Sequence, residues 1–166
     1  MISIEIASEA DIEELTGVEI ESKLQSYPEH MEEVSIDPAI RLYRWQTYFR
    51  GESPASSKPE RIVFKAVKEG RIVGFIAGHL TNRHKDSEIE NFYVLKDEQG
   101  KGIGTELLKK LLPWLISHNA KSLCAGIFPE NPYQAFYLKY GSGYLNPHWV
   151  YWDDLPLLKS KLLPIN

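Results

Sequence analysis

The sequence contains little cysteine and no long apolar run. Cys124 is the only cysteine among 166 residues, which excludes an intrachain disulfide and fits a reducing compartment. Stretches of about 20 apolar residues, the length that spans a membrane, are absent. The first residues also lack the pattern of a secretory leader. We therefore expect a cytoplasmic protein with no membrane partner, in which Cys124 lies in the core.

An excess of positive charge is also missing. The formal net charge is −4, so we do not expect binding to nucleic acid or to an anionic membrane. Lysines nevertheless gather near one glycine-rich turn, at Lys101, Lys109 and Lys110, where they suit a polyphosphate. A hydrophobic content of 43% and a charged content of 25% are those of a globular protein. The length predicts a single domain over residues 1–166.

Hydrophobic periodicity predicts an α+β protein with a mixed sheet. Strands are predicted at about 2–6, 61–68, 71–80, 87–95, 121–128 and 149–152, and helices at about 11–25, 40–49, 105–117, 132–140 and 155–163. Residues 51–59 are rich in Gly, Ser and Pro and predict a loop. Pro113 predicts a kink in its helix. An antiparallel meander followed by a strand–turn–helix–strand unit predicts the mixed sheet.

The segment Gln99-Gly100-Lys101-Gly102-Ile103-Gly104 joins a predicted strand to a predicted helix. Glycine lets the backbone approach a ligand closely, because it has no Cβ. The N–H groups of the first helical turn point at such a ligand, and the helix dipole favours negative charge. The segment therefore predicts an anion site that suits a diphosphate.

Other readings of these glycines need comparison. A Walker A loop requires Gly-x-x-x-x-Gly-Lys-Ser/Thr, which the segment does not contain. A Rossmann turn requires a third glycine where Leu107 stands, and an acidic residue about 20 positions further on, where Cys124 stands. From the glycines alone, an ordinary turn with no ligand stays open.

Two further segments, together with this turn, resemble the GCN5-related N-acetyltransferase (GNAT) superfamily. Gln99, Gly102 and Gly104 match the family motif Gln/Arg-x-x-Gly-x-Gly/Ala. The strand over residues 88–94 carries two carboxylates before the turn, and residues 131–141 match a second family segment. The resemblance covers nearly the whole chain. It implies the GNAT fold, a mainly antiparallel mixed sheet of six to seven strands with one parallel pair, flanked by about four helices.

The resemblance also implies an activity. The family binds acetyl-CoA and moves the acetyl group to an amine by direct attack, so we expect an N-acetyltransferase acting on a primary amine of a small molecule or peptide. A non-catalytic acyl-CoA-binding or regulatory module on the same fold is the alternative, and a nucleotide-binding domain is a third reading. Dimerisation is common in the family, so a homodimer is an expectation from the resemblance alone.

The resemblance implies that most donor-site residues bind the ligand through backbone groups and not through side chains. The N–H groups of residues 99–105 would hold the CoA diphosphate, the N–H of Phe92 would lie near the thioester carbonyl, and Val94 would follow the pantetheine arm. Asn131 would cap a helix and contact the pantetheine side. The cofactor-binding residues expected in this way are Phe92, Tyr93, Val94, Gln99, Gly100, Lys101, Gly102, Ile103, Gly104, Thr105, Asn131 and Tyr137.

Three side chains are candidates for proton transfer. A free amine has a pKa near 10, so it must lose a proton before it attacks, and a carboxylate of raised pKa can accept that proton. Glu88 matches the strand glutamate that is the base in some family members, and Glu90 shares its face in a regular strand. Alternatively, both are surface acids at the edge of the cleft. Tyr137 matches the tyrosine that protonates the departing thiolate, with a core aromatic residue as its alternative.

Two expectations concern what the site lacks. His79, His84 and His118 have no regular ligand spacing and no cysteine pair exists, so we expect no metal. The family's last hairpin is usually longer than residues 142–148 allow. The acceptor pocket is therefore expected to be more open, or to be completed by the first two helices, the loop at 51–60 or a partner chain.

Overall fold

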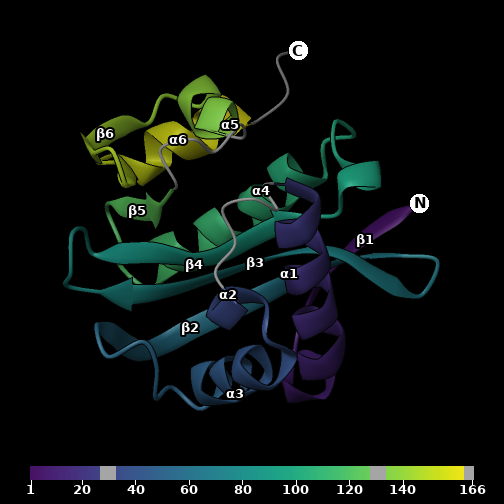
Figure 1. Cartoon of the computed structure of the whole chain (residues 1–166). Coiled ribbons are helices and arrows are strands. Elements are labelled where there is room, and N and C mark those ends of the chain that lie inside the picture. The colour runs from purple at the N-terminus through teal and green to yellow at the C-terminus, as the bar shows by residue number, and fades with distance from the viewer. Residues whose placement is uncertain (27–32, 128–133, 163–166) are drawn as a thin grey trace.

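The computed structural model describes residues 1–26, 33–127 and 134–162, in which helices cover a seven-stranded sheet (Figure 1). The strands are β1 (Ile2–Ile6), β2 (Ser57–Lys68), β3 (Arg71–Thr81), β4 (Ser87–Val94), β5 (Leu123–Gly126), β6 (Gly143–Asn146) and β7 (Trp149–Trp152). Their order across the sheet is β1-β2-β3-β4-β5-β7-β6. The β4–β5 pair is parallel and the other pairs are antiparallel, which confirms the predicted mixed sheet.

The helices are α1 (Ile12–Ser26), α2 (Glu33–Ile36), α3 (Pro38–Phe49), α4 (Ile103–Ser117), α5 (Gln134–Lys139) and α6 (Leu155–Leu162). Figure 1 shows α1 and α3 on the near side of the sheet and α4 behind it. Local sequence explains where α3 begins. Asp37 Oδ1 accepts a hydrogen bond from the N–H of Ile40 (3.0 Å), and Pro38 occupies the first turn, where no N–H is needed.

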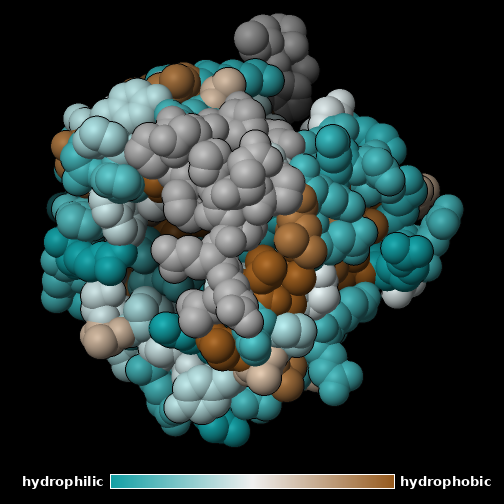
Figure 2. Space-filling model, in the orientation of Figure 1, coloured by the Kyte–Doolittle hydropathy of each residue, from teal (hydrophilic) through white to brown (hydrophobic). Residues whose placement is uncertain are grey.

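The core lies on both faces of the sheet. On α4, Leu107, Leu108, Leu111, Leu112 and Leu115 are completely buried. On the opposite face, Trp45 of α3 packs edge-on against Phe75 of β3, with ring centroids 5.2 Å apart. The surface over α1 and α3 is mainly hydrophilic, with small hydrophobic groups near its centre (Figure 2). Cys124 is buried, as predicted.

Several sequence predictions differ from the structure in detail. Residues 57–59 belong to β2 and not to the predicted loop, because Ser57 pairs with Thr81 of β3. The helix α4 runs through Pro113 without interruption, so the predicted kink stays a prediction. The short hairpin expected at 142–148 is present as β6 and its turn into β7. Asn131 and its predicted helix cap lie outside the described residues. Within the described part of the chain, no helix combines the length and the apolarity that crossing a membrane requires.

A bulge in β4 shapes the centre of the sheet. Ile89 pairs with Gly78 and Asn91 pairs with Ala77, so Glu90 is the extra residue of a β-bulge. The parallel ladder joins Glu88 to Cys124 and Ile89 to Ala125. Beyond it, β5 ends at Gly126, whereas β4 continues to Val94. The strands β4 and β5 therefore pair only along the first part of β4, and the bulge at Glu90 lies where this pairing ends.

Candidate active site

A cavity of about 480 Å³ lies between the end of β4, the glycine-rich turn and α5. Most of the predicted donor-site residues line it, namely Phe92, Tyr93, Val94, Gln99, Gly100, Gly102, Ile103, Gly104, Thr105 and Tyr137. The Lys101 side chain is exposed, and its Nζ lies 3.2 Å from Glu98 Oε2. We call this cavity the donor cleft.

The glycine-rich turn gives the donor cleft a backbone wall. Gly100 and Gly102 have φ values of +76° and +85°, which L-residues with a Cβ rarely adopt. Gly102 is the N-cap of α4 and has no side chain to bond the first-turn N–H groups. Gln99 Nε2 donates to the Val94 carbonyl (2.9 Å) and so ties the turn to β4. This arrangement fits a diphosphate at the start of α4.

The other end of the donor cleft is aromatic. The ring of Phe92 lies 5.4 Å from that of Phe136 and 6.5 Å from that of Tyr137, centroid to centroid. Both rings lie against Gly104, where a Cβ would be in ordinary van der Waals contact with Phe136 (3.4 Å) and Phe92 (3.5 Å). Tyr137 is half-buried and lines the cleft, so the structure places it at a site wall and not within a closed core.

Two smaller cavities continue from the donor cleft along β4. One of about 310 Å³ lies between β4 and β5 and shares Phe92, Tyr93 and Tyr137 with the donor cleft. The next, of about 70 Å³, lies under α1 and α3 and shares Glu90 and Asn91 with the second. We call this last cavity the acceptor pocket. The bulged residue Glu90 therefore lies at the boundary between the space near the donor cleft and the acceptor pocket.

Glu88 is buried, so the alternative of a surface acid is wrong for it, whereas Glu90 lies at the edge of two cavities. Glu88 is 3% exposed, and burial raises its pKa to about 7, although Arg83 opposes the shift. Its Oε1 lies 3.4 Å from Arg83 Nη2. Glu90 is half-buried, and burial raises its pKa as well. Each carboxyl group influences the titration of the other, so the two form an interacting pair in which Glu88 holds a proton near neutral pH.

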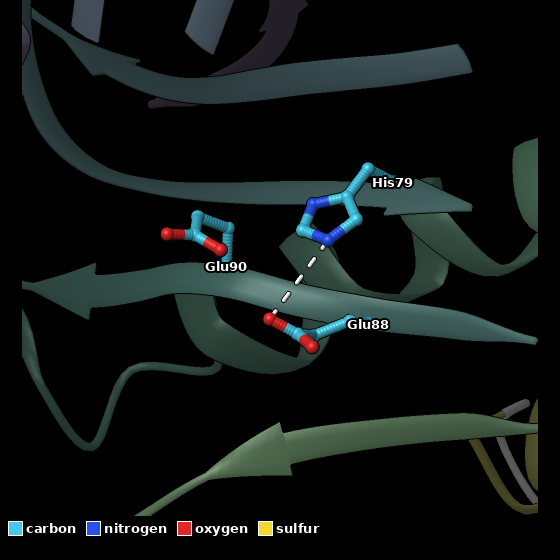
Figure 3. A group of neighbouring side chains, drawn as sticks. All are labelled: His79, Glu88 and Glu90. Atoms are coloured by element: carbon cyan, nitrogen blue, oxygen red, sulfur yellow. Dashed lines mark ion pairs between the residues drawn. The ribbon is translucent and has the colours of Figure 1, made fainter. Parts of the chain in front are cut away.

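His79 completes this cluster and was not predicted from the sequence. It lies on β3 opposite Glu88, with its Nε2 3.8 Å from Glu88 Oε2 (Figure 3). Its Nδ1 is 3.1 Å from the Tyr48 hydroxyl. Burial, helped by Arg61 and Arg83, lowers the His79 pKa to about 4, so the ring is neutral at pH 7. Only the pairing of β3 with β4 reveals this neighbour, because no local motif contains both residues.

The spacing of His79, Glu88 and Glu90 bears on the expectation of no metal. One ligand atom from each lies within 4.8 Å of the others, which residue spacing in the sequence could not show. Arg83 pairs with Glu88, and the charges of Arg61 and Arg83 both act on His79. Two guanidinium groups beside the cluster would repel a divalent cation there, which favours the prediction of no metal. That absence stays a prediction.

Solved structures share this fold. The PaiA N-acetyltransferase from Thermoplasma acidophilum, crystallised with coenzyme A, matches with a TM-score of 0.69 at 20% identity, over 91% of this chain and 97% of that one. A GNAT-family acetyltransferase from Staphylococcus aureus Mu50 matches with a TM-score of 0.71 at 17% identity, over 93% and 99%. These likenesses confirm the predicted fold.

The sequence defines the family. The model of the Acetyltransferase (GNAT) family matches residues 19–142, and the chain therefore belongs to this family. A curated relative, the L-2,4-diaminobutyric acid acetyltransferase of Nocardia farcinica, is 37% identical over 65 residues, which are 39% of this chain. That match spans only 34% of the relative's length.

Proposed function

We propose that this protein is an acetyl-CoA-dependent N-acetyltransferase that moves an acetyl group to a primary amine by direct attack. The observation that carries the proposal is the row of three cavities along β4, in which a cleft walled by the glycine-rich turn leads past Glu90 to a charged pocket. Family membership and the coenzyme A bound to the Thermoplasma relative support the donor. The name of the Nocardia relative supports an amine acceptor.

On the donor side, the chain contributes mainly backbone dipoles. The first-turn N–H groups of α4, opened by Gly100 and Gly102, bind the diphosphate. The N–H of Phe92 is directed at the thioester oxygen and stabilises the negative charge that develops there. Acetyl-CoA supplies the activated acetyl group, and the aromatic end of the cleft excludes water around it.

On the acceptor side, we assign the base to Glu90. Its carboxyl group borders both smaller cavities, whereas Glu88 is buried behind it beside His79. The proton leaves the attacking amine for Glu90, and Glu88, beside His79, influences the affinity of that carboxylate for the proton. A raised carboxyl pKa reduces the gap to the amine pKa and so favours this transfer. Glu88 is then a positioning residue.

Tyr137 is assigned as the acid for the departing thiolate. It lines both the donor cleft and the cavity between β4 and β5, where the bond to sulfur breaks. Its ring is held by Phe92 and by Trp152, whose centroid is 5.7 Å away. A phenol in this place donates a proton or a hydrogen bond to sulfur as the negative charge forms.

Binding and turnover test the proposal separately. Calorimetry with coenzyme A measures the donor cleft, and thiol release from acetyl-CoA over a panel of amines measures transfer. We expect coenzyme A to bind and thiol release to depend on an added amine. Binding without transfer to any amine would favour the non-catalytic module, and no binding of coenzyme A would overturn the donor site. The homodimer and the single-domain organisation stay predictions.

A further inference from the structure

The acceptor pocket presents two arginines from one face of α3. Arg41, Arg44, Trp45 and Tyr48 all line it, at helical spacings of three and four. Opposite them, the pocket is lined by two acids, Glu19 of α1 and Glu90 of β4. The distribution of charge between these groups decides what kind of acceptor the pocket suits.

The Glu19 carboxylate already accepts hydrogen bonds from two side chains other than the arginines. Trp45 Nε1 donates to its Oε1 (2.9 Å), and Lys23 Nζ donates to its Oε2 (2.6 Å). Arg41 Nη1 lies 3.6 Å from that same Oε2, beyond ordinary hydrogen-bond length. Lys23 therefore compensates the charge of Glu19, and Arg41 has only a weak ion pair with it.

The two arginines are consequently in excess on the α3 side. Within the described residues, the buried Nε of Arg41 has no hydrogen-bond partner. Arg44 is exposed, and its charge acts on Glu90, whose pKa is raised by burial, so Glu90 is a weaker counter-charge than an exposed carboxylate. The lining thus combines a cationic wall on α3 with a proton acceptor on β4.

Such a pocket discriminates between amines by their second charged group. A polyamine would bring an ammonium group against two guanidinium groups, and like charges in a confined pocket repel. A carboxylate would instead accept paired hydrogen bonds from a guanidinium fork. The cationic wall also disfavours the protonated form of the reacting amine and so increases the fraction that can attack.

We propose that the acceptor is a small amine that carries a carboxylate, an amino acid and not a polyamine, with its carboxylate on Arg44 and Arg41 and its amine directed at Glu90. The pocket volume of about 70 Å³ suits a small acceptor better than a peptide. The turnover test of this inference rests on the proposed acetyl transfer, whereas its binding test does not.

Matched acceptor pairs that differ only in the carboxylate test the inference. Alanine is compared with ethylamine, ornithine with putrescine, and lysine with both lysinamide and cadaverine. We expect kcat/KM to be about 30-fold higher for each amino acid than for its partner without the carboxylate, as for a charge pair in a partly buried site. A peptide with a free N-terminal amine is tested as a further acceptor in the same assay. Preference for a diamine, or for the peptide, would overturn the inference.

Arginine variants locate the preference in the pocket. Arg44→Gln should reduce the ratio between ornithine and putrescine to near one, and Arg44→Glu should invert it. Because Arg44 is exposed, these changes leave the core intact. Arg50→Gln is the matched control, since Arg50 is an exposed arginine at the end of α3 and does not line the pocket. An unchanged ratio in Arg44→Gln would refute the assignment.

A binding measurement separates this inference from the proposed function. Calorimetry titrates ornithine and putrescine into the protein saturated with coenzyme A, where no transfer occurs. Tighter binding of ornithine supports the inference even if no amine is acetylated. Acetylation of putrescine in preference to ornithine would leave the proposed function standing and the inference refuted. Equal binding of the two ligands would also refute the inference.

Discussion

The donor cleft and the acceptor pocket lie along one strand but are built by different means. The donor cleft is formed by the end of β4, one glycine turn and the start of α4, so residues 92–105 provide most of its wall. The acceptor pocket is formed by side chains of α1, α3 and β4, with Ser53 and Pro54. The first uses backbone dipoles that one continuous segment can present. The second uses charged side chains that only tertiary packing brings together.

The largest expected effect comes from a side chain added to the backbone wall. Gly102→Glu places a negative, bulky group at the N-terminus of α4 and should weaken coenzyme A binding at least about 100-fold, because the site is selective for anions. Calorimetry measures the affinity. Gly70→Glu is the matched control, since Gly70 is also exposed, has a φ of +76° and has equally open space around it.

Both variants carry the same backbone strain, so their comparison isolates the ligand site. If Gly70→Glu binds coenzyme A as the parent does while Gly102→Glu does not, the glycine turn is the diphosphate site. Normal affinity in Gly102→Glu would show that the ligand binds elsewhere.

This difference in construction explains what the sequence could predict. Gln99, Gly102 and Gly104 lie within one short segment, so their motif predicted the turn that lines the donor cleft. Apolar residues at helical spacing likewise predicted α4, and two neighbouring β-rich runs at 61–68 and 71–80 predicted the strands β2 and β3. Such features depend on neighbours in the chain, which a sequence shows directly.

The acceptor pocket could not be predicted in the same way. His79 meets Glu88 only because the β3–β4 register pairs them, and Glu90 reaches two cavities only because a bulge falls at its position. Glu19 and Arg41 are brought together by the packing of α1 on α3. None of these contacts has a local signal, and the burial that raises the pKa of Glu88 follows from the same packing.

The next prediction asks which carboxyl group serves the acceptor side. Glu90→Gln removes the proposed base and should lower kcat about 100-fold, the range typical of a lost general base. Glu88→Gln leaves that base in place and should lower kcat less, by about 10-fold, because Glu90 loses the neighbouring carboxyl group that influences its titration. Steady-state thiol release measures both variants, with coenzyme A affinity as a folding control. The opposite ranking would assign the base to Glu88.

The pH dependence sharpens the same assignment. Burial raises the pKa of both carboxyl groups, so Glu90 gains a proton as the pH falls and can then accept none from the amine. The base form of Glu90 therefore accumulates as the pH rises, and kcat/KM should fall by up to about tenfold per pH unit below the raised pKa of Glu90. Dividing the parent profile by that of Glu90→Gln, with the same amine, cancels the titration of the amine. A flat ratio between pH 5 and 8, roughly the range where such groups titrate, would exclude the pair.

Tyr137 lines the donor cleft and also the cavity that leads from it toward the acceptor pocket, so its variant probes the junction between them. Tyr137→Phe should lower kcat about 10-fold while coenzyme A affinity stays within about twofold, because the ring that packs on Phe92 is kept and only the acidic hydroxyl is lost. Tyr144→Phe removes an exposed hydroxyl that bonds Gln134 and serves as the control. Equal kcat in the parent and Tyr137→Phe would leave this tyrosine a purely structural role.

The smallest effect is expected at Lys101, and it tests whether the donor cleft depends on backbone alone. Lys101 was predicted to contribute through its N–H and as one of the lysines near the turn, but its side-chain ammonium pairs with Glu98, which also pairs with Lys68. Lys101→Gln should therefore change coenzyme A affinity by less than about threefold, the effect of an exposed ion pair. Lys85→Gln, which loses an ion pair with Asp153 and does not line the donor cleft, is the control. A loss of tenfold or more at Lys101 alone, diminishing at high salt, would mean that a side-chain charge holds the diphosphate and that the two regions are built more alike than their geometry indicates.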